Sequence, residues 1–122
     1  MSKPIRVSGV GCCLVDRLYN NVSFSSEIFL SYSTKQRGDG GLSPGHLVLK
    51  EEFEGFAKKD FKIVLKELIG DKVPDKINVG GPCIVALIHA AQITHDQNRE
   101  IKFYGCYGED NNGKFLLSTL QK

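Results

Sequence analysis

Three features of this sequence have residue types that could bind a ligand: a glycine pair, an aspartate and a glycine-rich loop. Gly80 and Gly81 belong to the stretch NVGGPCIVALIHAA, where they precede an apolar segment with helical spacing. The pair has three interpretations: a cradle for phosphate, a close-packing turn, or one wall of a pocket for a hydroxylated ligand. No further glycine or lysine supports phosphate binding, which leaves the turn and the pocket wall.

Asp16 follows the first apolar run of the chain, from Val10 to Val15. Such a run predicts a strand that is buried on both faces, as in a parallel sheet covered by helices. Ligands of open α/β sheets bind at the carboxyl ends of the strands. Asp16 is therefore a candidate ligand-binding carboxylate, and its alternative role is a charge that marks the end of a strand.

Residues 22–33 alternate in character: the even positions are apolar except for Ser26, and the odd positions are polar except for Phe29. A period of two predicts strands with one wet face and one covered face. We therefore expect a small sheet outside the main core, within residues 17–50, to which the segment HLVLK adds a short strand. The glycine-rich loop KQRGDGGLSPGH lies between these strands.

The second half of the chain predicts a helix, a strand and a helix. An amphipathic helix over 60–70 comes first, with Asp60 at its start and Gly70 at its end. Gly81 and Pro82 then suit the start of a helix over 82–95, which is long enough to cross between parallel strands. A buried strand, IKFYGCYG, and a final helix capped by Asp110 follow.

Length and composition set the class of protein. The 122 residues suffice for one domain, and a net charge of +2 gives no reason to expect nucleic acid as a partner. No apolar run approaches a membrane span, and the first residues lack the apolar core of a signal peptide, so we expect a cytoplasmic protein without membrane contact. The four cysteines have no CxxC spacing and predict reduced thiols in the core, with no metal site.

Only two strands have the character of main-sheet strands, which would leave their edges unpaired. The helical pattern also continues to Lys122 without a capping residue. We therefore expect an α/β fold that is incomplete in this chain, as a fragment or as a part completed by a partner.

In this order, the motifs VSGVGCCLVD, NVGGPCIVALIHAAQI and FYGCYGEDNNGKFLLSTL resemble the amino-terminal portion of ribokinase-like (PfkB) carbohydrate kinases. The resemblance implies a Rossmann-like parallel sheet with flanking helices and a small β-sheet lid at 17–50, all within one domain over 1–122. It also implies an ATP-dependent kinase for a sugar or nucleoside, with a homodimer formed through the lid.

The resemblance assigns the substrate side of such an enzyme to five residues of this chain. Asp16 would bind a sugar hydroxyl, Gly80 and Gly81 would let the backbone approach the sugar, and Asp39 and Gly41 would close over it from the lid. No catalytic, cofactor-binding or metal-binding residue is assigned. ATP and Mg²⁺ would serve the complete enzyme, and none is expected on this chain alone.

Two departures from the family pattern matter. An asparagine that usually contacts a sugar hydroxyl is replaced by Val85, so Asn78 or Asp39 is a candidate to supply that contact. The carboxy-terminal GAGD-type segment, which carries the catalytic aspartate and the anion hole, has no counterpart, so we expect this chain alone to be inactive. The alternative function is a non-catalytic sugar-binding or dimerisation module. A dehydrogenase is less well supported, because GVGCCLVD keeps only two glycines of GxGxxG.

Overall fold

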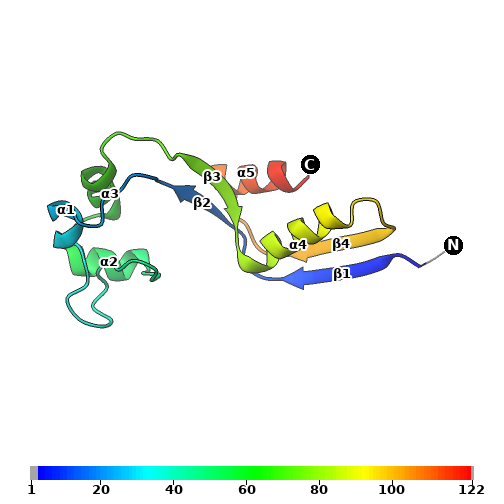
Figure 1. Cartoon of the computed structure of the whole chain (residues 1–122), viewed down its shortest axis with the longest axis horizontal. Helices are drawn as coiled ribbons and strands as arrows, with labels where there is room; N and C mark the ends of the chain where they lie inside the picture. Colours follow the sequence, from blue (N-terminus) through cyan, green and yellow to red (C-terminus); the bar gives the residue numbers. More distant parts are fainter. Residues whose placement is uncertain (1–2, 122) are drawn as a thin grey trace. The chain divides into compact units, whose positions relative to one another are not determined.

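The computed structural model describes residues 3–121 as a mixed α/β chain (Figure 1). Its elements, in chain order, are β1 (Ile5–Val10), β2 (Leu14–Leu18), α1 (Glu27–Ser31), α2 (Lys50–Ala57), α3 (Phe61–Ile69), β3 (Lys76–Gly80), α4 (Pro82–Ile93), β4 (Arg99–Tyr104) and α5 (Asn111–Leu120). The contacts divide the chain into two units. The sheet unit joins the residues up to Leu18 with those from Lys76 onward, and the helical unit is Tyr19–Asp75.

A parallel pair of strands, β1 and β4, forms one sheet of the sheet unit, with Val7 opposite Ile101. The helix α4 packs against both strands and precedes β4 in the chain (Figure 1). A Cβ on Gly9 would lie 2.5 Å from the Cys83 sulfur, so this glycine lets α4 approach β1 closely. The predicted helical crossover to a parallel strand is confirmed.

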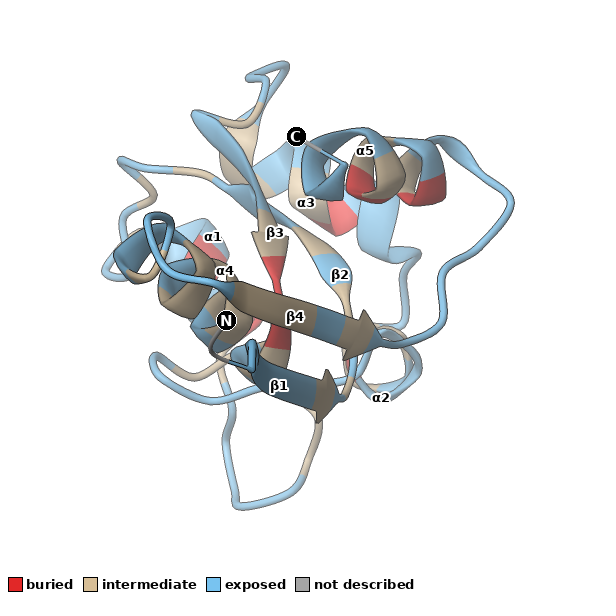
Figure 2. Ribbon diagram, turned by 90° about the vertical axis from the view of Figure 1, so that its right-hand side faces the viewer, coloured by how far each residue is buried: buried red, intermediate tan, exposed pale blue. Residues whose placement is uncertain are grey.

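The apolar run from Val10 to Val15 does not form the predicted continuous strand. β1 ends at Val10, and the chain re-enters a sheet at Leu14 to pair antiparallel with β3, in a second two-stranded sheet (Figure 2). A Cβ on Gly11 would lie 3.0 Å from the Cys83 Cβ, so the link passes close to α4. The prediction of burial on both faces is also wrong, because α4 covers one face and Val10 is 80% exposed.

The two helix starts in the sheet unit match the predicted ones. Gly81 is the N-cap of α4 with φ of +117°, and Pro82 takes the first helical position. Asp110 is the N-cap of α5 and its carboxylate accepts a hydrogen bond from the Gly113 amide at 2.8 Å. Both starts therefore follow from local chemistry that the sequence displays.

The helical unit does not contain the strands predicted for residues 22–33. Ser26 is instead the N-cap of α1, where its hydroxyl accepts a hydrogen bond from the Phe29 amide at 3.2 Å. Ser31 and Ser33 donate to the carbonyls of Ile28 and Phe29. The serines that suggested a wet strand face thus cap and follow a short helix, and the only pairing in this described segment is an isolated bridge between residues 33 and 42.

The core of the helical unit forms around Tyr32, Phe53 and Val64, which come from the end of α1, from α2 and from α3. The segment HLVLK is not a strand, and its Lys50 begins α2, a helix that the sequence did not predict. The predicted helix α3 is confirmed, and Gly70 ends it with φ of +67°. The Asp60 side chain makes no capping hydrogen bond at the start of α3, where Glu54 accepts a hydrogen bond from the Phe61 amide at 2.8 Å.

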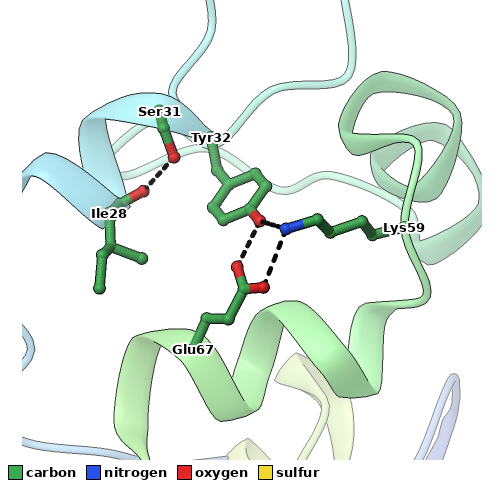
Figure 3. A network of polar contacts seen from close by, with 5 residues as sticks. All are labelled: Ile28, Ser31, Tyr32, Lys59 and Glu67. Atoms are coloured by element: carbon green, nitrogen blue, oxygen red, sulfur yellow. Dashed lines mark hydrogen bonds and ion pairs between the residues drawn. The ribbon is translucent and has the colours of Figure 1, made fainter.

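A polar network closes over one side of this core (Figure 3). The Tyr32 hydroxyl donates to Glu67, and Lys59 donates to the same hydroxyl at 2.9 Å and to Glu67 at 2.8 Å. These bonds hold the pKa of Lys59 above its ordinary value and the pKa of Glu67 below its own. The network ties the end of α1 to α3 and to the loop between α2 and α3.

The cysteines are free thiols, but they are not core residues. Cys12 and Cys106 are exposed, and Cys13 and Cys83 are half-buried. The core prediction is therefore wrong for all four, and most clearly for Cys12 and Cys106, which follow the exposed ends of β1 and β4. Over residues 3–121, no helix combines the length and the apolar character needed to cross a membrane.

Candidate functional site

Asp16 lies in the middle of β2, not beyond the end of a buried strand as predicted. Its position follows from the break in the apolar run, since the chain begins a new strand at Leu14. In the antiparallel register of β2 and β3, Asp16 stands directly opposite Asn78. The candidate site is therefore a strand surface and not the carboxyl end of a parallel sheet.

The two faces of the β2–β3 sheet have different neighbours. On one face α5 packs against β2, and the Arg17 guanidinium donates to the Asn112 side chain at 2.7 Å. Because side chains alternate along a strand, Asp16 belongs to the opposite face. That face, which we call the open face, carries Leu14, Asp16, Leu18, Lys76, Asn78 and Gly80.

Asp16 and Asn78 are exposed, and neither side chain has a hydrogen-bond or ionic partner among the described residues. Directly opposite residues in an antiparallel pair place their Cβ atoms about 4.5–5.5 Å apart. A residue whose carboxylate accepts hydrogen bonds thus stands opposite one whose amide both donates and accepts. Two neighbouring hydroxyl groups of a polyol match this pair, one donating to Asp16 and the other bonding to Asn78.

Gly80 gives the Asp16 side chain its position. A Cβ at Gly80 would lie 2.3 Å from Asp16 Oδ2 and 2.5 Å from Leu14 Cδ1, so both side chains lie over the bare α-carbon of this glycine. Gly80 is itself buried beneath them. Any larger residue there would displace the carboxylate.

Glycine is required at position 81 for a different structural reason. Its φ of +117° is unfavourable for residues with a side chain, and a Cβ would lie 2.3 Å from the Cys12 carbonyl oxygen. The pair is thus a close-packing turn at the start of α4, and its first member also belongs to the open face. The close-packing turn is therefore confirmed, whereas the wall of a pocket for a hydroxylated ligand stays a prediction.

Asp39 and Gly41 belong to the helical unit, where they shape the glycine-rich loop. The Asp39 carboxylate accepts the amides of Lys35, Gln36 and Gly41 and the Thr34 hydroxyl, at 2.7–3.0 Å. These bonds, that from Gly41 above all, hold the pKa of Asp39 well below its ordinary value. The carboxylate is therefore already engaged in ordering its own loop.

A cavity of about 460 Å³ opens within the same loop and is lined by residues of 34–48 and by Glu52. A Cβ on Gly41 would lie 2.6 Å from the Thr34 backbone, so this glycine allows the two sides of the loop to meet. The loop geometry is built by internal hydrogen bonds, and Asp39 is less available than Asp16 for a ligand.

Val85 lies in the first turn of α4, half-buried, and its amide donates to the Gly81 carbonyl at 3.1 Å. Of the two polar residues that the sequence suggested as substitutes for it, only Asn78 lies beside Asp16 on the open face. Sequence reasoning named Asn78 without pairing it to Asp16, because the pairing depends on a strand register that the apolar run concealed.

The described residues contain no cluster of three or more His, Cys, Asp or Glu side chains arranged to hold a metal ion. The described segments around Asp16 do not contain the glycine-rich loop with a lysine that binds phosphate in nucleotide-binding proteins. We therefore derive no step that involves ATP or a metal ion from this chain.

Comparison with known proteins adds no relative to this picture. No protein-family model matches the chain. No curated protein and no solved structure matches it either.

Proposed function

We propose that this chain forms the acceptor-binding part of an ATP-dependent carbohydrate kinase of the ribokinase-like type, acting on a sugar or a nucleoside. The observation that carries the proposal is the pair of Asp16 and Asn78 on the open face. Both side chains are exposed, opposite each other and without partners among the described residues. Carboxylate and amide groups at this spacing suit the adjacent hydroxyl groups of a sugar or ribose ring.

The order of motifs along the chain supports the same reading. A parallel βαβ arrangement through α4, a glycine pair at the start of that helix and an aspartate-capped final helix all resemble the first part of these kinases. In the complete enzyme, ATP would supply the transferred phosphoryl group, and this chain's residues would hold and orient the acceptor hydroxyl.

The exposed surface supports a role as one part of a larger assembly. The chain exposes 9451 Å². Two separate compact proteins of the sizes of the two units would together expose only about 7,900 Å². The excess area includes apolar side chains of β1 in the β1–β4 sheet, where Ile5 is 55% and Val10 is 80% exposed. Surfaces of this kind are ordinarily covered by further polypeptide.

Calorimetric titration with ribose, glucose and adenosine tests the proposal, and 1-propanol serves as a control ligand that lacks neighbouring hydroxyl groups. We expect at least one polyol to bind the wild-type chain, with a Kd on the order of millimolar for two or three exposed hydrogen bonds. Asp16→Asn should weaken binding about tenfold, because the amide nitrogen cannot accept a hydrogen bond from the hydroxyl.

Asp96→Asn is the matched control, since Asp96 is an exposed aspartate of the same unit without a partner among residues 3–121. Its affinity should equal that of the wild type. An Asp16→Asn variant that binds every polyol as the wild type does would refute the role of Asp16. ATP-dependent phosphorylation of any of these sugars by the purified chain would refute the assignment of this chain to the acceptor side alone.

A further inference from the structure

All four cysteines of the chain lie in the sheet unit, around one edge of the β1–β4 sheet. Because β1 and β4 are parallel and in register, their carboxyl ends meet at this edge. The segments that follow them also stay together. The Gly11 amide donates to the Tyr104 carbonyl at 3.2 Å, and a Cβ on Gly105 would lie 3.0 Å from the Gly11 carbonyl oxygen.

Cys13 and Cys106 are joined across these two segments. The Cys13 thiol donates to the Cys106 carbonyl oxygen at 3.2 Å, although the residues are 93 positions apart in the sequence. That oxygen is separated from the Cys106 sulfur by only four covalent bonds. A disulfide needs Cα atoms about 4.4–6.8 Å apart, and the hydrogen bond brings the Cys13 sulfur to the backbone of Cys106.

Both residues are open to reagents. Cys106 is exposed and Cys13 is half-buried. They line the same cavity of about 490 Å³, which Tyr107 and the start of α5 complete. A small oxidant can therefore reach the two thiols from the same side.

The other two cysteines have different surroundings. Cys83 packs between α4 and β1, where its side chain lies against Gly9 and Gly11. Cys12 is adjacent to Cys13, and a disulfide between neighbouring residues would force the intervening peptide bond away from its planar trans form. Cys13 and Cys106 are the two cysteines that a hydrogen bond joins across the two segments.

We propose that Cys13 and Cys106 are a redox pair that hydrogen peroxide oxidises to a reversible disulfide. The Cys106 thiolate attacks the O–O bond, which yields a sulfenic acid and releases hydroxide. The Cys13 thiolate then attacks that sulfur, forming the S–S bond and expelling a second hydroxide. The sulfurs lose two electrons, the peroxide gains them, and the two thiol protons leave with the hydroxides as two waters.

The disulfide would restrain the start of β2, the strand that carries Asp16, since Cys13 immediately precedes it. It would fasten the link between the two sheets to the segment after β4. A low-molecular-weight dithiol would reverse it. This inference concerns thiol chemistry alone and does not depend on the proposed sugar binding.

The test treats the reduced chain with equimolar hydrogen peroxide and maps its peptides under non-reducing conditions. The expected product is a peptide pair joined through Cys13 and Cys106, with the mass loss of two hydrogen atoms. Of the four thiols, two should remain titratable. The wild-type map needs no variant, so a variant that fails to fold cannot obscure it.

Variants then identify the pair. Cys13→Ser and Cys106→Ser should each abolish the cross-link, whereas Cys12→Ser should retain it. The oxidised wild type should also unfold at a higher temperature than the reduced protein, because the bond closes a long loop. A link from Cys12 to Cys13 or Cys106, or oxidation of Cys106 to sulfinic acid without any cross-link, would overturn the proposal.

Discussion

Replacing Gly81 with alanine should destabilise the sheet unit strongly. The native φ of +117° and ψ of 124° lie in a region that alanine occupies rarely, at a cost of about 1–3 kcal/mol. The added Cβ would lie 2.3 Å from the Cys12 carbonyl oxygen, which is backbone and cannot rotate away. Crowding of this kind costs about 1–3 kcal/mol more, so we expect a total loss of about 2–6 kcal/mol.

Thermal unfolding followed by circular dichroism measures this effect. For a unit of this size, each kcal/mol shifts Tm by about 4–8 °C, so Gly81→Ala should lower Tm by at least about 8 °C. Gly55→Ala is the matched control in the helical unit. Gly55 lies exposed in α2, with nothing near the position of an added Cβ. Alanine there should raise the stability of the helical unit by about 0.5–1 kcal/mol, because it is the better helix former.

The two substitutions add the same methyl group, at Gly81 to a strained and crowded turn and at Gly55 to an open helix surface. If Gly81→Ala unfolded at the wild-type temperature, the tight turn between β3 and α4 would be refuted. If Gly55→Ala lost as much stability as Gly81→Ala, the loss would reflect a general intolerance of substitution and not the turn.

Two further predictions concern the helical unit. Asp39→Asn should speed proteolytic cleavage within residues 34–41. In the wild type the carboxylate accepts hydrogen bonds from backbone amides, and the amide nitrogen of asparagine cannot accept them, so the loop should loosen. Since folding lowers the pKa of Asp39, its contribution to stability is complete above the ordinary value of about 3.9 and is lost as the pH falls below it. Acid titration of the cleavage rate should show loosening below about pH 4 in the wild type and no such step in Asp39→Asn. Tyr32→Phe should lower Tm by about 4 °C, because it removes the hydroxyl shared by Lys59 and Glu67, whereas Tyr107→Phe, at an exposed tyrosine, should leave Tm unchanged.

Local signals in the sequence predicted the second half of the sheet unit well. Gly81 and Pro82 begin a helix, Asp110 caps another, and the apolar segment between them forms a strand parallel to the first. In each case, the residue that fixes the boundary acts on its immediate neighbours, so the sequence alone suffices.

The failures arose where tertiary contacts decide the structure. Serines in 22–33 fit a strand face by spacing, but Ser26 caps a helix whose Phe29 is needed in the interior, where it is 7% exposed. The run from Val10 to Val15 was divided between two sheets because β3 offers β2 an antiparallel partner. The site followed the same rule: Asp16 and Gly80 were identified by type, but the partnership of Asp16 with Asn78 required the register of β2 and β3.

The most direct test of the account is a nuclear magnetic resonance titration of the isotope-labelled chain with the polyol that binds best. If the open face binds hydroxyl groups, the amide signals that move should be those of Asp16, Asn78 and Gly80, with those of the Asp39 loop unchanged. If only signals around the cavity of the glycine-rich loop moved, or only those around Cys106 and α5, hydroxyl binding at the open face would be contradicted.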